Sequence, residues 1–286
     1  PANVFKLATS TTENILIALS SDEDNALYVF QYYVAQNKRL QSAWHKWTYG
    51  STTSDKILNI DFIENTLFIV NERSDGVYLE SIDVSPALTD SGETYLTHLD
   101  RKINNTQITE SYNAGTNQTT ITLPYAINNT MKVVGRSGAS NKAGQEIATV
   151  SQSGTSIVVS GDITAQNFFI GEQYEFEFQF SQQFLQVADS GGSRVSVKEG
   201  RLQIRNWSVS FNDTGFFTTE VTPVGRSTSN STFTGTVVGS GLTGTVNLED
   251  GDFTFAVQSE NDKLTVKIKN NSHLPSNFIN ASWQGF

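Results

Sequence analysis

The chain of 286 residues contains no cysteine. It therefore has no disulfide scaffold, no thiolate zinc site and no cysteine nucleophile. Histidine is scarce as well: His45, His98 and His273 are never spaced as neighbouring metal ligands are. We accordingly expect no cofactor, no metal centre and no small-molecule substrate.

Positive charge is also in short supply. There are 19 Lys and Arg against 29 Asp and Glu, a formal net charge of −10. Tight wrapping of nucleic acid is disfavoured, because it needs clustered Lys and Arg. No apolar run approaches the ~20 residues that cross a bilayer, and residues 1–10 do not resemble a signal peptide. The first residue is proline rather than methionine, so we expect a processed chain or a fragment.

Charged residues amount to only 17%, whereas Ser, Thr, Asn and Gln are abundant. Such a composition favours strands and turns and supplies few helix formers. No convincing amphipathic helix longer than two turns is found. The predicted fold class is all-β: partial β-propeller-like blades followed by small antiparallel β-barrel or sandwich domains.

Two similar hairpins occupy the first part of the chain. The first joins Asn14–Ser20 to Ala26–Val34, a strand apolar on both faces that we expect to be covered on both sides. The second joins Thr66–Asn71 to Val77–Val84 through Asp75-Gly76, a strong turn signal. They repeat after about 50 residues, as propeller blades do, but two copies cannot close a propeller of at least about four blades. We predict that residues 5–84 form two antiparallel sheets packed face to face, with an open edge.

Two breaks divide the remainder. Residues 86–100 mix Pro, Gly and acids, and Ser190–Ser193 is rich in glycine. We predict incomplete propeller-like blades over 1–100, a β-rich domain over 101–185 and a β-sandwich-like domain over 186–286.

The clearest alternation in the chain runs over Tyr174–Phe180. Its aromatic residues face one way, which we expect to be buried, and Glu175 and Glu177 face the other. The two carboxylates lie about 7 Å apart on a strand, a spacing that a glycosidase pair permits. An acidic stripe opposite an aromatic one is also the ordinary solvated face of a half-buried sheet.

Other motifs lack the context that their chemistry requires. Asp-Ser/Thr-Gly begins at Asp90, Asp189 and Asp213, without the spacing of two protease lobes. A G-x-G-x-x-G pattern over 239–244 precedes a strand-like segment rather than a helix, so it predicts a hairpin connection. No catalytic residue is assigned, and we expect no enzyme.

Two acidic segments, Asp22–Asn25 and Glu249–Asp252, are either calcium ligands or plain turns. Trp44 and Trp47 lie on opposite faces of a predicted strand. They serve either as exposed stacking platforms or in core packing.

An ordered set of segments resembles the tail tubular protein B family, the nozzle protein of T7-like podophages. No single motif is chemically diagnostic, but their order covers nearly the whole chain. The segments are Gln41–Tyr49, Phe62–Val70 with Arg73–Gly76, Tyr95–Arg101, Ile121–Tyr125, Tyr174–Ser181, Gly200–Trp207, Asp213–Phe217, Leu274–Ser276 and Ala281–Phe286.

The resemblance implies a structural protein of the virion at the distal tail, with 101–185 as a nozzle-type domain. Six copies would form the tube, contact the tail adaptor and the tail fibres, and let genomic DNA pass without specific binding. Family members are longer, so this chain would be a C-terminal portion. Acidity suits such a passage, with Glu175 and Glu177 as a lumen-facing or solvent-facing stripe.

An alternative of another class is a carbohydrate-binding module or a glycan-degrading enzyme of a tail or secreted protein. It would use Trp44, Trp47 or Trp207 as sugar platforms and Glu175 with Glu177 as acids.

Overall fold

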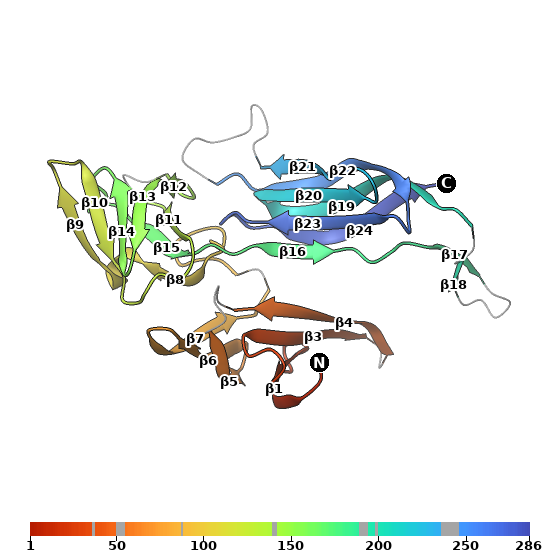
Figure 1. Cartoon of the computed structure of the whole chain (residues 1–286), viewed down its shortest axis with the longest axis horizontal. Helices are drawn as coiled ribbons and strands as arrows, with labels where there is room; N and C mark the ends of the chain where they lie inside the picture. Colours follow the sequence, from red (N-terminus) through yellow and green to blue (C-terminus); the bar gives the residue numbers. More distant parts are fainter. Residues whose placement is uncertain are drawn as a thin grey trace. The chain divides into compact units, whose positions relative to one another are not determined.

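The computed structural model describes residues 1–35, 38–49, 55–86, 88–138, 142–188, 194–197, 200–235 and 246–286 (Figure 1). The prediction of an all-β chain is confirmed: apart from a 3-10 turn at Asn105–Gln107, every regular element in these ranges is a strand. The chain divides into two compact units. Unit 1 comprises Pro1–Thr89, Thr106–Met131 and Thr149–Thr164, and unit 2 comprises Asp90–Asn105, Lys132–Ala148 and Ala165–Phe286.

Unit 1 contains three antiparallel sheets (Figure 1). The first is a meander of β1 (Val4–Ser10), β2 (Ile15–Ser20), β3 (Ala26–Ala35) and β4 (Lys38–Thr48). The second consists of β5 (Lys56–Ile63), β6 (Thr66–Arg73) and β7 (Gly76–Asp83). The third, in the order β13-β14-β10-β9, consists of Thr149–Ser153, Ser156–Ser160, Gln118–Thr122 and Thr109–Asn113.

The first two sheets share one core. Leu27 and Val29 of β3 belong to the same buried cluster as Leu67 and Ile69 of β6, and all four are fully buried. Each predicted hairpin is present, as β2–β3 and as β6–β7. In the described part of the chain β7 pairs with β6 alone, which leaves an open edge. The prediction of two packed antiparallel sheets over residues 5–84 is therefore confirmed.

The inward row of β6 changes from apolar to polar along the strand. Leu67 and Ile69 are followed on the same face by Asn71 and Arg73, both of which are buried. The Arg73 guanidinium lies 2.9 Å from a carboxylate oxygen of Glu80 and 3.9 Å from the buried carboxylate of Asp55. One end of this core is thus held by charge rather than by apolar contact alone.

Unit 2 contains a four-stranded sheet in the order β12-β11-β15-β8 and a β-sandwich. The four strands of that sheet are Glu146–Ile147, Met131–Gly135, Phe168–Glu172 and Asp100–Asn104. One layer of the sandwich is β16 (Phe176–Gln179), β23 (Leu264–Asn270), β20 (Phe216–Pro223) and β21 (Ser229–Thr234), in that order. The other layer is β22 (Glu249–Glu260), β19 (Gln203–Thr214) and β24 (Asn277–Gly285). A separate two-stranded ribbon joins β17 (Leu185–Ala188) to β18 (Arg194–Val197).

The sandwich core is rich in aromatic residues. Trp207 and Phe211 of β19 and Phe217 of β20 are buried in one cluster with Val266 and Ile268 of β23. Phe217 also lies 5.1 Å from Phe233 and 5.2 Å from Phe278 between ring centres. β16, which belongs to the predicted segment 101–185, is hydrogen-bonded into this sandwich through β23. The predicted division into three domains stays a prediction.

One predicted turn is wrong. Glu249–Asp252 begins strand β22 and pairs with residues 210–214 of β19. A bulge in β19 between Phe211 and Thr214 lets the acidic residues pair there, and the Asp250 carboxylate accepts a hydrogen bond from the Asp213 amide at 2.8 Å. The predicted glycine-rich break at 190–193, the motif at Asp189 and the G-x-G-x-x-G pattern over 239–244 lie outside the described residues.

Candidate docking surface

The first sheet of unit 1 is covered on one face and open on the other. The inner residues of β3, Leu27 and Val29, are fully buried, whereas the outer residues Tyr28 and Phe30 are only half-buried. Trp44 of β4 lies 4.9 Å from Phe30 between ring centres and is 54% exposed. Because both faces of Ala26–Val34 are apolar, the sequence predicted that both would be packed against other parts of the protein. In the described chain the inner face is packed in this way and the outer face is open.

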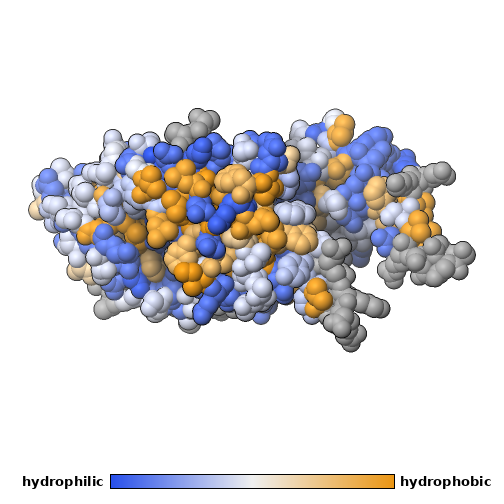
Figure 2. Space-filling view, turned by 90° about the horizontal axis from the view of Figure 1, so that it is seen from below, coloured by the Kyte–Doolittle hydropathy of each residue, from blue (hydrophilic) through white to orange (hydrophobic). Residues whose placement is uncertain are grey.

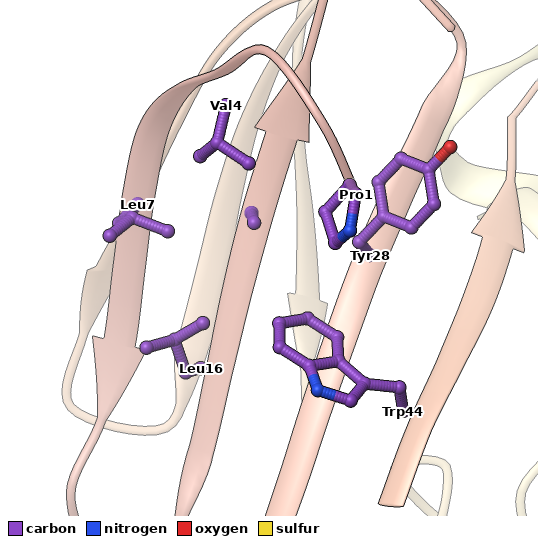
Figure 3. A pocket seen from close by; sticks show the side chains of 7 residues that line it. Pro1, Val4, Leu7, Leu16, Tyr28 and Trp44 are labelled. Carbon is purple, nitrogen blue, oxygen red and sulfur yellow. The ribbon is translucent and has the colours of Figure 1, made fainter. Parts of the chain in front are cut away.

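The open face is hollowed into a groove of about 610 Å³ (Figure 3). Figure 3 shows side chains from the four strands of one sheet around it, with the Trp44 ring lying across it. Figure 2 shows apolar side chains gathered over the first strands of the chain, with polar ones around them. The groove is lined by Pro1, Val4, Leu7, Leu16, Ala18, Tyr28 and Trp44.

The acidic segment Asp22–Asn25 lies beside this face, and its carboxylates have protein partners. Glu23 accepts hydrogen bonds from the Tyr28 hydroxyl and, at 2.9 Å, from Lys46, and these bonds lower the pKa of Glu23. Asp22 accepts a bond from Asn3 at 2.7 Å, and Asp24 lies 3.3 Å from Lys56. Within the described residues no group of three or more His, Cys, Asp or Glu side chains could hold a metal ion.

The predicted tryptophan platforms separate into exposed and buried residues. Trp44 is half-exposed at the groove, and Trp47 packs against the core on the opposite face of the sheet. Trp207 is 3% exposed, inside the sandwich, so it offers no surface on which a sugar could stack.

Glu175 and Glu177 lie on the outer face of the sandwich, within a charge ladder of five residues: Glu175, Glu177, Glu220, Lys267 and Lys269. The Glu177 carboxylate lies 2.9 Å from the Lys267 ammonium and 3.1 Å from that of Lys269. Lys269 also reaches Glu220 at 3.3 Å and Glu175 at 3.7 Å. Hydrogen bonds from Lys267 and Lys269 lower the pKa of Glu177. A general acid of a glycosidase needs a raised pKa, so this carboxylate is unsuited to that role.

The expectation that the aromatic face of this strand is buried is wrong in part. Phe176 is 39% exposed and Phe178 is 51% exposed, whereas Phe180 lies 4.8 Å from the Trp207 ring and packs against the core. The reason is the position of β16 at the edge of its sheet, where the opposite layer extends only to β24.

The complete chain, residues 1–286, matches the sequence profile of the family described as bacteriophage nozzle protein. The chain belongs to this family. Tail tubular protein gp12 of Escherichia phage T7 is 25% identical to it over 299 residues, a match that covers 100% of this chain and 36% of that relative. The predicted resemblance is thereby confirmed, and the protein is a structural component of the virion tail.

The protease-like motifs serve local structure in this tail protein. Asp90 accepts hydrogen bonds from the Thr97 amide at 2.7 Å and from the Lys102 ammonium at 2.6 Å, which fixes the segment before β8. Asp213 has a positive φ of 44° and lies at the bulge of β19. Asp90 thus holds a loop together, and Asp213 occupies an irregular position within a strand.

Sequence reasoning missed a network of two half-buried histidines in unit 2. The His98 ring bonds to the Tyr174 hydroxyl at 2.9 Å, and the His98 amide donates to the carbonyl of His273 at 2.9 Å. The His273 ring bonds to the Gly144 carbonyl at 2.8 Å. Residues so far apart in sequence carry no shared local pattern, so only a long-range pairing signal would have revealed the network.

Proposed function

We propose that this chain forms part of the wall of the tail tube through which phage DNA leaves the particle. Six copies would surround the passage, with the tail adaptor and the tail fibres as neighbours. The observation that carries the proposal is the open apolar face of the first sheet, a surface that further protein of the tail would cover. Apolar faces of this kind are sites of protein contact rather than ordinary solvent-exposed surface.

The proposed cover of that face is another β-sheet of the same, longer protein. The inner face of the first sheet already packs against a second antiparallel sheet, so a similar sheet fits the outer face by the same geometry. The match covers only 36% of the relative, so that relative has ample further chain. The first two sheets would then be two blades of a propeller-like ring.

Net charge agrees with a passage for DNA. A chain of formal charge −10 repels phosphate, and a lumen that repels DNA does not retain it. The charge ladder offers one candidate stretch of wall, in which each lysine is already shared with carboxylates and is not free to collect phosphates.

Electron cryomicroscopy of the tail tests the proposal directly. A six-fold ring at the distal tail, with a sheet seated on the groove of Leu7, Leu16 and Trp44, is the expected result. A tail in which this groove faces solvent would contradict the propeller-like arrangement. A chain located on the capsid or along a fibre would contradict the tube itself.

Substitution at the groove gives an independent test. Trp44→Asp is expected to reduce incorporation of the protein into particles, because a carboxylate would be buried against an apolar partner. Val224→Asp is the matched control, since Val224 is an exposed aliphatic residue of unit 2 outside the groove. Equal incorporation of the two variants would refute a buried role for Trp44.

We also propose that the chain has no hydrolase activity. Among the carboxylates considered, Glu177 has a lowered pKa and Asp90 is engaged by Lys102. Turnover of a glycan or peptide substrate that Glu177→Gln or Asp213→Asn abolishes would reverse this conclusion.

A further inference from the structure

The sandwich of unit 2 is open along one side. β16 and β24 form its two layers there, and the Phe176 ring lies 6.0 Å from that of Phe278. In the part of the chain that the structure describes, β16 pairs only with β23 and β24 only with β19. Phe176 and Phe178 therefore remain 39% and 51% exposed, although they lie on the inward face of their strand. Two free backbone edges thus flank exposed aromatic rings.

The ribbon β17–β18 carries an exposed aliphatic face that could cover such rings. Leu185 pairs with Val197 and Val187 pairs with Val195, so these four aliphatic residues share one face. Leu185, Val187 and Val195 are each about half exposed. At the base of the ribbon, Leu185 and Val197 border a groove with Leu202 of the same sandwich, whereas Val187 and Val195 are not among the residues that line it. Figure 1 shows the ribbon beyond the ends of the sandwich strands. An isolated two-stranded hairpin is marginally stable in water, so this ribbon is expected to need a partner.

The ribbon is held away from the aromatic side of its own sandwich. Beyond β16, the Phe180 amide donates to the Val266 carbonyl at 3.0 Å. The Gln183 side chain accepts from the indole of Trp283 at 3.1 Å, and the Gln183 carbonyl accepts from Asn261 at 2.7 Å. The segment that leads from Phe178 to Leu185 is thereby fixed along its own sandwich, and the ribbon begins past the last of these contacts.

We propose that the aliphatic face of the β17–β18 ribbon of one copy covers the open aromatic side, Phe176 and Phe178, of a second copy. This inference rests on the proposed ring. Donor and acceptor surfaces are different parts of the chain, so the contact is heterologous: each copy gives one ribbon and receives one. Heterologous contacts are the kind that generate closed rings. In this contact the ribbon would add a strand to a free edge of β16 or β24 in the second copy, while its aliphatic face packs on the aromatic rings. Such a contact is a form of strand addition.

This chain contains no cysteine, so the introduced thiols are the only ones within it, and wild-type particles treated in the same way give the background of the cross-linking test. Phage particles carrying Val187→Cys with Phe178→Cys are treated with a short bis-maleimide and separated under denaturing conditions. The expected product is a ladder of covalent multimers that ends at the copy number of the ring. The pair Val187→Cys with Val224→Cys is the matched control and should stay monomeric, because Val224 lies outside the aromatic side.

Two results would overturn the inference. One is a tail of normal appearance in which the first pair gives only monomers, and the other is an intramolecular cross-link within one chain. Wild-type tails without a ring would instead overturn the proposed function, so the two failures are distinguishable by electron microscopy of the wild type.

A second test uses serine substitutions, so that the proposal can still be checked if the cysteine variants do not assemble. Leu185→Ser with Val187→Ser should leave thermal unfolding of the chain nearly unchanged and reduce its association to monomer in sedimentation. Val224→Ser should do neither. Unchanged association of the ribbon variant, at a concentration where the wild type is a ring, also rejects the proposed contact.

Discussion

Arg101 and Glu172 form an ion pair inside unit 2. A guanidinium nitrogen of Arg101 lies 3.1 Å from a Glu172 carboxylate oxygen, and each side chain is only 5% exposed. The two residues belong to neighbouring strands, β8 and β15, whose register brings Asp100 opposite Glu172. A pair of this kind is costly to break, because the remaining charge stays buried without its counter-ion.

Glu172→Ala is therefore expected to lower the free energy of unfolding by about 3–5 kcal/mol. Arg101→Met combined with Glu172→Leu should cost far less, since neither charge remains. Urea unfolding of the three proteins followed by circular dichroism measures both effects. If the double variant is as unstable as the single one, the loss comes from packing rather than from the isolated charge.

The two half-buried histidines predict a loss of stability in acid. Burial lowers the pKa of both His98 and His273; Lys102 lowers the pKa of His98 further, and Asp90 opposes it. Around His273, Glu146 raises the pKa, Lys132 lowers it, and the bond to the Gly144 carbonyl raises it. The folded state favours the neutral form of both imidazole rings, whereas in the unfolded chain the rings protonate near pH 6.5. The contribution of the neutral rings to the free energy of unfolding is therefore complete above about pH 6.5 and is lost as the pH falls below that value.

Thermal unfolding at pH 8 and at pH 5.5 checks this direction. The wild type should lose more stability between the two than the variant with His98→Gln and His273→Gln. Carboxylates such as Glu177 contribute equally to both proteins, so the difference isolates the histidines. Identical losses in the two proteins would show that these rings do not couple to folding.

At the scale of single residues, the sequence predicted the strand face on which a side chain lies better than it predicted how deeply that side chain is buried. It placed Glu177 opposite the phenylalanines of its strand, as observed. It did not predict that Lys267 and Lys269 would lie beside Glu177, because that contact depends on a strand about 90 residues later. Nor did it predict the exposure of Phe178, which follows from the place of β16 at the edge of its sheet in the described part of the chain.

Strand β15 illustrates a constraint at the scale of elements. Gly171 is buried, and a Cβ added there would lie 2.7 Å from the Asp100 carbonyl oxygen, closer than such atoms approach. The register of β15 and β8 shifts at this point. Close approach of two backbones is a common reason for glycine inside a strand.

Gly171→Ala should destabilise unit 2, because the β8–β15 pairing must move apart to admit the methyl group. Gly251→Ala is the control: it lies in β22, and its added Cβ would have only an ordinary 3.7 Å contact with Phe211. Midpoints of thermal unfolding should fall for the first variant and change little for the second. A similar fall in both would attribute the effect to strand glycines in general.

Elements with a strong local signal were predicted, and those without one were missed. The β6–β7 hairpin was found because Asp75-Gly76 separates two apolar runs. The acidic start of β22 was assigned to a turn, since only its pairing with a bulged β19 makes it a strand.

The whole molecule is acidic, and its charge predicts weak contact with DNA. Phosphate binding needs clustered Lys and Arg, whereas six copies would carry 6 × −10 = −60 formal charges from this portion. Fluorescence anisotropy with labelled duplex DNA should detect no tight binding at low salt. Tight binding that weakens steeply with salt would contradict both this expectation and the proposed passage.

At this scale the family was predictable from the ordered motifs, but the open surfaces were not. Composition predicted an all-β chain, and the repeat of two hairpins predicted two packed sheets. To predict the groove beside Trp44, one would have to know that the described part of the chain leaves one face of a doubly apolar sheet open. No local sequence pattern encodes which face of such a strand is left open.

The pairing of β16 with β23 also sets a schedule for synthesis. Phe176 meets Asn270, so this aromatic strand leaves the ribosome long before its hydrogen-bonding partner exists. At a synthesis rate of roughly 5–20 residues per second, the interval of about 90 residues lasts on the order of 5–20 s. During that interval its phenylalanines are available to other nascent chains, and slower translation prolongs the exposure. We therefore expect the yield of correctly folded protein to depend on the speed of the ribosome across β17 to β23.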